Sequence, residues 1–165
     1  MTSEPGPIPD VLDRICEWAS LTPNSVALEY GGERTNYAQL ASDAENLAGS
    51  LDTESRLVLL RMGDPARTLI AYLGILLAGK TVVPINPTAP PARNSRIVRR
   101  SGAGAVVFDS VPAADEVAWW SELGARSFTL GEPSRSASDQ PVKRFDKAYV
   151  PVSYTHLTLP TKRIV

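Results

Sequence analysis

Hydrophobic and polar residues alternate with two different periods along the chain, and the changes of period predict its elements. The stretch after Pro9-Asp10 carries apolar side chains at helical spacing, with Leu12, Ile15 and Ala19 on one stripe and Val11 and Trp18 beside them. This spacing is typical of an amphipathic helix. The following stretches "SVALEY", "GGE" and "RTNY" have the composition of two short strands joined by a glycine turn. A small N-terminal β-hairpin is therefore expected.

A second amphipathic helix is expected directly after the hairpin. Asn36 is a good N-cap residue, and Gln39 stands three positions further on. Together they match a capping box, in which each side chain hydrogen-bonds a backbone N–H of the other residue. The apolar stripe of this helix consists of Leu40, Ala44, Leu47 and Leu51.

Short apolar runs then alternate with longer helical segments. The runs "RLVLLRM", "TVVPI", "AGAVVFD" and "SFTL" have no polar alternation, as is typical of strands buried on both faces. The segment "KAYV", which ends at Val150, is expected to begin one more strand. Regular alternation of this kind favours an α/β fold with a mainly parallel sheet flanked by helices.

Three helices are expected between these runs. Asp64-Pro65 provides an N-cap and a proline for "ARTLIAYLGILLA", which is apolar nearly all round and is expected to be buried. Pro90-Pro91 opens the basic segment "ARNSRIVRR", and "AADEVAWWSEL" supplies a short last helix. Gly131 to Asp146 is rich in Ser and Pro, as surface loops are.

Composition narrows the class of protein. The 165 residues are 43% hydrophobic and 21% charged, which is a globular balance. The net charge is −1, so a nucleic-acid partner is not expected. The longest apolar run, Leu69 to Ala78, is shorter than the roughly 20 residues that span a bilayer, so no membrane partner is expected either. We expect a cytoplasmic protein.

The segment "GILLAGKT", Gly74 to Thr81, matches the pattern of a nucleotide-binding P-loop. A P-loop follows a strand and opens a helix, whereas this segment is expected to end a helix and lead into a strand. Its four variable positions are also apolar. We therefore interpret Gly79 as the C-cap of the helix and Lys80 as a solvated loop residue. A Walker-type NTPase is disfavoured.

Four motifs of the chain resemble motifs of one known enzyme family, and they occur in the same order as in that family. "LLAGKTVVPINP" resembles the L-K-A-G-x-x-Y-V-P-L-D-P motif of adenylate-forming (AMP-binding) enzymes, such as adenylation domains of nonribosomal peptide synthetases and acyl-CoA ligases. "TPNSVALEYGGE", "TNYAQL" and "RSGAGAVVFD" resemble three further motifs of that family. The likeness covers residues 9–150, which would form an incomplete N-terminal subdomain of the adenylate-forming fold.

The resemblance implies a carboxylate-activating reaction. In the family, the enzyme uses ATP and Mg²⁺ to form an acyl-adenylate. The acyl group is then transferred to the thiol of CoA or to the phosphopantetheine thiol of a carrier protein. The substrate would be a small carboxylic or amino acid, with a carrier protein as a possible partner. The family's phosphate loop follows "AYV", but here it is not found after Val150. We therefore assign no catalytic, cofactor-binding or metal-binding residue.

The stretch after Val150 has another expected origin. A transposase mosaic end and its sequencing adapter translate in frame to the residues from Val152 onward, with a stop codon directly after Val165. We expect residues 152–165 to be translated adapter, with the junction inside the codon of Pro151, and such segments are excluded from fold reasoning. The only histidine, His156, is then no candidate base.

These inferences give a domain plan and two hypotheses for function. Residues 1–8 are expected to be a disordered N-terminus, 9–150 a partial AMP-binding domain, and 151–165 an artefactual tail. The first hypothesis is a truncated piece of an ATP-dependent carboxylate-activating enzyme, itself inactive. The alternative is a non-enzymatic α/β binding module, because one fold supports many functions.

Overall fold

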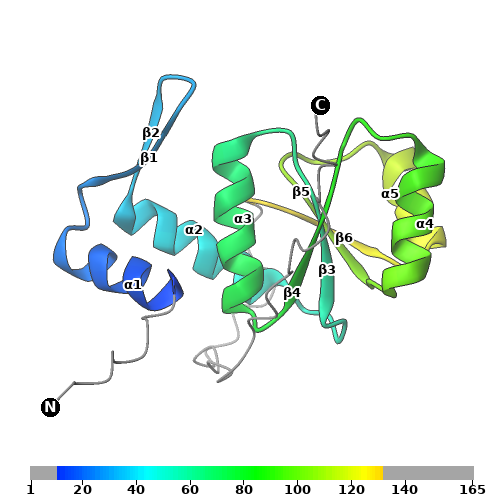
Figure 1. The fold of residues 1–165 in the computed structure, drawn as a ribbon, viewed down its shortest axis with the longest axis horizontal. Helices are drawn as coiled ribbons and strands as arrows, with labels where there is room; N and C mark the ends of the chain where they lie inside the picture. The colour runs from blue at the N-terminus through cyan, green and yellow to red at the C-terminus, as the bar shows by residue number, and fades with distance from the viewer. Residues whose placement is uncertain (1–10, 132–165) are drawn as a thin grey trace, which may run out of the picture.

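A computed structural model describes residues 11–131 of the chain (Figure 1). It contains a two-stranded hairpin, a four-stranded sheet and helices on both faces of that sheet. The element order is α1 (Val11–Leu21), β1 (Val26–Tyr30), β2 (Glu33–Asn36), α2 (Tyr37–Ser50), β3 (Leu57–Arg61), α3 (Pro65–Leu77), β4 (Thr81–Ile85), α4 (Pro91–Ser101), β5 (Ala105–Phe108), α5 (Ala114–Glu122) and β6 (Arg126–Thr129).

The hairpin is closed by two glycines. Strands β1 and β2 pair antiparallel, with Tyr30 opposite Glu33, so Gly31 and Gly32 form a two-residue loop. Their φ angles are 62° and 86°. Two positive φ values in a two-residue loop define the turn that matches strand twist, and glycine adopts them without steric cost. The predicted hairpin is confirmed.

The large sheet is entirely parallel and has the order β4-β3-β5-β6. Strand β3 therefore lies between the next two strands of the sequence. One row of residues, Val83, Leu59, Val106 and Ser127, runs across all four strands. The chain first winds toward β4 and then crosses back to β5, which creates a topological switch point beside β3.

Two hydrophobic cores cover the two faces of the sheet. Val58 and Leu60 belong to the core beneath α2 and α3, whereas Leu59 belongs to the core beneath α4 and α5. Figure 1 shows α3 on one side of the sheet and α4 and α5 on the other, with α2 and α1 beyond α3. Because both faces are covered, the strands are continuously apolar, as the sequence predicted. The α/β class with a mainly parallel sheet is confirmed.

Local caps explain where two helices begin. Asn36 Oδ1 accepts from the Gln39 backbone N–H at 2.8 Å, and Asp64 Oδ1 accepts from the Arg67 N–H at 2.9 Å. The second half of the predicted capping box is wrong, because the Gln39 side chain donates to Asp43 Oδ1 at 2.8 Å instead. A carboxylate one turn ahead competes for the amide, since charged acceptors form the stronger hydrogen bonds.

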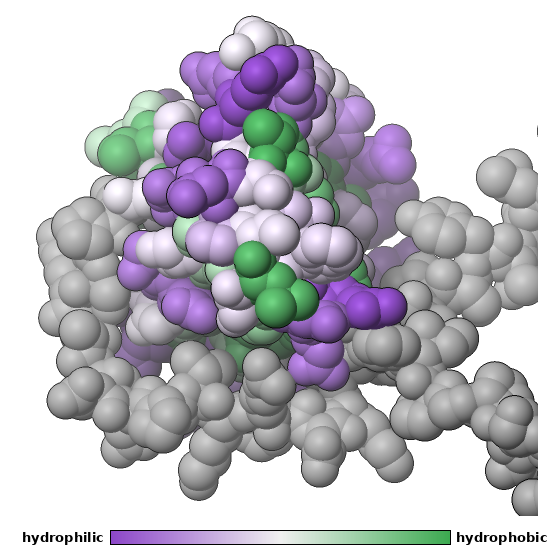
Figure 2. Space-filling model, turned by 90° about the vertical axis from the view of Figure 1, so that its left-hand side faces the viewer, coloured by the Kyte–Doolittle hydropathy of each residue, from purple (hydrophilic) through white to green (hydrophobic). Residues whose placement is uncertain are grey.

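Helix α3 is not buried all round as its composition predicted. Ile70, Ala71 and Leu73 are buried, but Leu69 and Tyr72 remain exposed among the described residues. The end of the molecule that carries α1 and the hairpin also exposes apolar side chains, including Trp18, Leu21, Val26 and Tyr30. Figure 2 views this end and shows hydrophobic side chains in separate small patches among polar ones. Scattered exposure of this kind is normal for a protein surface.

The predicted disordered residues 1–8, the strand "KAYV" and the tail 151–165 all lie outside the described residues. The proposed domain boundaries therefore stay predictions.

Candidate functional site at the carboxyl edge of the sheet

The carboxyl ends of the parallel strands meet at one edge of the sheet. In open parallel sheets, ligands bind in the crevice at this edge, where the strand order reverses. Here the switch lies between β3 and β5, so the candidate site begins with the residues that follow these strands. Gly63 and Asp64 come after β3, and Asp109 comes after β5.

Asp109 joins the ends of the two strands. Its Oδ2 accepts from the Gly63 backbone N–H at 2.9 Å. Burial by itself would raise the pKa of the Asp109 carboxyl, but hydrogen bonds from backbone N–H groups, among them those of Gly63 and Asp64, and the nearby Arg67 guanidinium outweigh it. They hold the pKa below its ordinary value of 3.8. Asp109 is therefore a carboxylate at neutral pH and ties the β3–α3 turn to β5.

Arg67 extends this connection to β6. Its Nη2 donates to the Asp109 backbone carbonyl at 2.6 Å and to the Leu130 carbonyl at 3.0 Å. Leu130 in turn donates its N–H to the Phe108 carbonyl at 2.9 Å. One guanidinium on α3 thus holds the chain directly after β5 and directly after β6.

We expect Asp109→Asn to change the pH dependence of stability. A carboxyl whose folded pKa is lowered contributes stability above the unfolded pKa and loses that contribution as the pH falls through the folded pKa. The variant keeps an acceptor for Gly63 but lacks the charge, so its free energy of unfolding near pH 7 should fall by about 0.5–1 kcal/mol. Denaturant unfolding from pH 7 down through the acid range measures this.

Asp115→Asn is the matched control, because Asp115 is an exposed carboxyl on a different element, in the first turn of α5. The difference in free energy of unfolding between wild-type protein and Asp109→Asn should become smaller below pH 4. The difference between wild type and the control should not change in this way. A gap for Asp109→Asn that is independent of pH would contradict a role for its charge.

An ion pair lies at the same edge on the other face. Arg61 Nη2 and Glu116 Oε1 are 2.9 Å apart, and both side chains are mostly buried. The Arg61 guanidinium also lies over the Phe108 ring, 5.5 Å from its centroid. Arg61 thereby links the end of β3 to the first turn of α5.

This pair borders a cleft of about 480 Å³ between the start of α4 and α5. Its apolar walls come from Pro87, Ala89, Pro91 and Trp119. Its polar lining residues are Arg61, Asn94, Asp115, Glu116 and Trp120. The volume is within the range of small-molecule sites.

The segment "GILLAGKT" lies elsewhere and is not a phosphate loop. Gly74 is inside α3, and Gly79 follows the helix end with a φ of 68°. The helix ends where the sequence predicted, although the C-cap residue is Ala78 and Gly79 is the left-handed residue directly after it. The segment leads into β4 at the amino edge of the sheet, opposite the edge where parallel sheets bind ligands.

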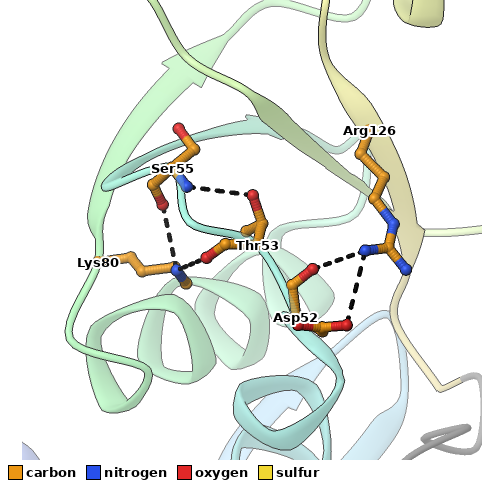
Figure 3. A network of polar contacts seen from close by, with 5 residues as sticks. All are labelled: Asp52, Thr53, Ser55, Lys80 and Arg126. Carbon is orange, nitrogen blue, oxygen red and sulfur yellow. Dashed lines mark hydrogen bonds and ion pairs between the residues drawn. The ribbon is translucent and has the colours of Figure 1, made fainter.

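Lys80 has a structural role in that segment. Its Nζ donates to the Thr53 carbonyl at 2.5 Å and to the Ser55 carbonyl at 3.1 Å, as Figure 3 shows. Burial lowers the pKa of the Lys80 ammonium, although the Asp52 charge acts in the opposite direction. Lys80 is therefore not the solvated loop residue that the sequence predicted, because its ammonium closes the loop before β3.

Sequence reasoning named no site residue and missed Arg67 and Asp109. A usable signal existed for Asp109, since an acidic residue directly follows the buried run "AVVF". Arg67 carried no signal, because its partners lie 42 and 63 positions away.

Among residues 11–131, no group of three His, Cys, Asp or Glu side chains is placed to hold a metal. None of the helices within these residues combines the length and the apolar composition that a bilayer span requires.

These features define a doubly wound α/β domain whose open crevice lies at the carboxyl edge of a parallel sheet. The chain belongs to the AMP-binding enzyme family, whose sequence model matches residues 15–152.

Known relatives resemble parts of the chain. It is 34% identical over 115 residues to an isonitrile lipopeptide synthase of Streptomyces coeruleorubidus, covering 67% of this chain and 8% of that protein. It is 28% identical over 109 residues to a D-alanine–D-alanyl carrier protein ligase of Bacillus anthracis, covering 64% and 22%. The chain thus spans less than a quarter of these relatives.

Solved structures share the fold. The nonribosomal peptide synthetase FmoA3 in its α-methyl-L-serine-AMP bound form has a TM-score of 0.67 and 27% identity, over 86% of this chain and 16% of that one. An o-succinylbenzoate CoA synthetase of Bacillus subtilis, in complex with an acyl-adenylate, has a TM-score of 0.64 at 18% identity, over 78% and 34%. At that identity the second likeness concerns the fold alone.

Proposed function

We propose that this chain is the N-terminal part of an ATP-dependent carboxylate-activating enzyme. In the first step a carboxylate oxygen attacks the α-phosphorus of ATP, which forms an acyl-adenylate and releases pyrophosphate. In the second step a thiol sulfur attacks the acyl carbon and AMP leaves. The acceptor thiol belongs to CoA or to the phosphopantetheine of a carrier protein.

The observation that carries the proposal is the family match over residues 15–152. The likeness to FmoA3 supports it, because that protein is described as bound to an aminoacyl-AMP and, in another form, to the ATP analogue AMPPNP. Both the isonitrile lipopeptide synthase and the carrier protein ligase are consistent with a small carboxylic or amino acid as substrate.

The described residues supply scaffold rather than reacting groups. The P-loop-like segment is part of α3 and its C-terminal turn, so it has no free loop to surround phosphates. The acids among residues 11–131 form no cluster that fits Mg²⁺, and we assign no step to that ion. Arg67 and Asp109 act as positioning residues in the proposal, because they hold the strand ends from which the chain continues.

The proposal includes the tail. If residues 152–165 are translated adapter, the native gene continues after the codon of Val150 into a phosphate-binding loop. The chain by itself then does not form adenylates.

Two experiments test the proposal. Independent sequencing of source DNA across the codons for "FDKAYV" is expected to continue into a Ser/Thr/Gly-rich loop with a lysine. The protein encoded by that longer gene is expected to exchange labelled pyrophosphate into ATP in the presence of one class of carboxylic acid, while the 165-residue chain stays at background. A stop codon directly after "KAYV", or no exchange with a broad panel of acids, would refute the assignment.

The acceptor is tested on the longer protein. Release of AMP that depends on CoA indicates a CoA ligase, and release that depends on a pantetheinylated carrier indicates an adenylation enzyme.

A further inference from the structure

Helix α4 carries four arginines and no acidic residue. All four are exposed to solvent: Arg93, Arg96, Arg99 and Arg100. The opposite side of the helix faces the core, where Val98 is 2% exposed. Figure 1 shows α4 at the outer right-hand side of the molecule, across the sheet from α3. The four side chains form a positively charged surface, here called the arginine face.

The fold does not neutralise this surface. Among residues 11–131, the arginines that form ion pairs are Arg14, Arg34, Arg61 and Arg126, and all of these lie outside α4. Exposed helices commonly offset a cation with an acid three or four positions away. Here the neighbours at those distances are further arginines, and like charges at this spacing destabilise a helix.

The helix dipole accounts for only part of the arrangement. Arg99 and Arg100 lie in the last turn, where the dipole favours cations. Arg93 lies in the first turn, where the dipole disfavours them, and Arg96 is in the middle of the helix. An arrangement that reduces local stability without a compensating contact inside the domain points to a function at the surface.

The spacing of the charges indicates the shape of the partner. Arg93, Arg96 and Arg100 follow one line along the helix, which extends about 10 Å at 1.5 Å per residue. The arginines are therefore spread along a convex surface and do not converge on one small anion. The face includes no exposed large apolar side chain, as membrane-surface helices do. The net charge of −1 also disfavours a nucleic acid. An acidic helix on the surface of another protein fits these features.

We propose that the arginine face docks an acidic helix of the carrier protein that provides the acceptor thiol. This inference rests on the proposed function and favours a carrier protein over CoA as the acceptor. Carboxylates of the carrier pair with the guanidinium groups of Arg93, Arg96 and Arg100, which can bind carboxylates through two hydrogen bonds. Exposed charges of this kind speed association and select the partner, and salt weakens their effect.

The first test measures carrier binding to the 165-residue chain. The probe is the apo D-alanyl carrier protein of Bacillus anthracis, because one relative of the chain is a ligase for such a protein. Labelled carrier is titrated with the chain at low salt, and fluorescence anisotropy gives the Kd. Saturable binding is expected. The triple variant Arg93→Gln, Arg96→Gln and Arg100→Gln should raise the Kd about tenfold while circular dichroism stays unchanged.

A second triple variant controls for net charge. Arg14→Gln, Arg34→Gln and Arg56→Gln remove the same number of charges from exposed positions outside α4. This variant should keep the Kd of wild type. A carrier whose helix acids are changed to amides should bind wild type about tenfold more weakly, and it should lose little further affinity for the α4 variant.

An equal rise of the Kd in both triple variants would overturn the proposal, because net charge alone would then explain binding. No saturable binding at low salt, or displacement of the carrier by an equal concentration of CoA, would overturn it as well.

The binding test requires no catalysis, so its failure differs from failure of the proposed function. Carrier binding that depends on α4, together with no pyrophosphate exchange by the longer protein, would refute carboxylate activation alone. Pyrophosphate exchange with unchanged carrier affinity in the α4 variant would refute the docking face alone.

Discussion

Gly74→Val is expected to lower the free energy of unfolding by about 3 kcal/mol. A Cβ at Gly74 would lie 2.8 Å from the Ala44 carbonyl oxygen and 3.0 Å from Leu47 Cβ on α2. The first neighbour is backbone and cannot turn aside, so α2 and α3 would have to separate. The destabilisation that results from overpacking this contact is larger than the stabilisation from the higher helix propensity of valine, which is below about 1 kcal/mol. Urea unfolding followed by circular dichroism measures the change.

Gly49→Val is the matched control on α2 itself. Apart from the nearby backbone of α2 itself, no heavy atom lies within 4 Å of a Cβ at Gly49, so this variant should remain within about 0.5 kcal/mol of wild type. Equal losses in the two variants would mean that the loss comes from the valine in a helix and not from the spacing of α2 and α3.

Arg67→Met is expected to destabilise the carboxyl edge of the sheet by about 1–2 kcal/mol. Methionine keeps much of the apolar stem but removes both donors, so the carbonyls of Asp109 and Leu130 lose a charged partner. The side chain is exposed, and water replaces part of the lost interaction. The end of β6 should be affected more than the strands at the centre.

Two measurements check this expectation. The free energy of unfolding gives the total loss, and hydrogen exchange of the Leu130 N–H reports the strand end, because that N–H bonds the Phe108 carbonyl. Arg99→Met, an exposed arginine on α4, should change neither by much. Unaltered exchange at Leu130 in Arg67→Met would argue against a clamp between α3 and β6.

The two predictions concern different functions of α3. Gly74 sets how closely α3 approaches α2 on one side, whereas Arg67 secures the strand ends on another. In an enzyme of the proposed kind, the segment after β6 leads toward the phosphate-binding loop. A loosely held strand end would place that loop less accurately. A misplacement of about 1 Å of the reacting groups strongly reduces the rate of an enzymatic reaction.

The sequence by itself determined the local structure of this protein. Gly31-Gly32 specified a tight hairpin turn, Asp64-Pro65 specified the start of α3, and the continuous apolar runs specified strands buried on both faces. These signals depend on residues at most a few positions apart in the sequence, so they can be identified from the sequence alone. The family motifs of the AMP-binding enzymes were readable for the same reason.

Only the tertiary structure decided the strand order β4-β3-β5-β6 and the partners of the polar side chains. Lys80 became a loop clamp and Gln39 turned to Asp43, although each had a plausible local alternative. Arg67 contacts Asp109 and Leu130, and Asn94 shares a cleft with Trp120, only because the crossover from β4 to β5, past β3, brings their elements together. Such contacts join residues tens of positions apart, and their geometry exists only once the sheet has formed.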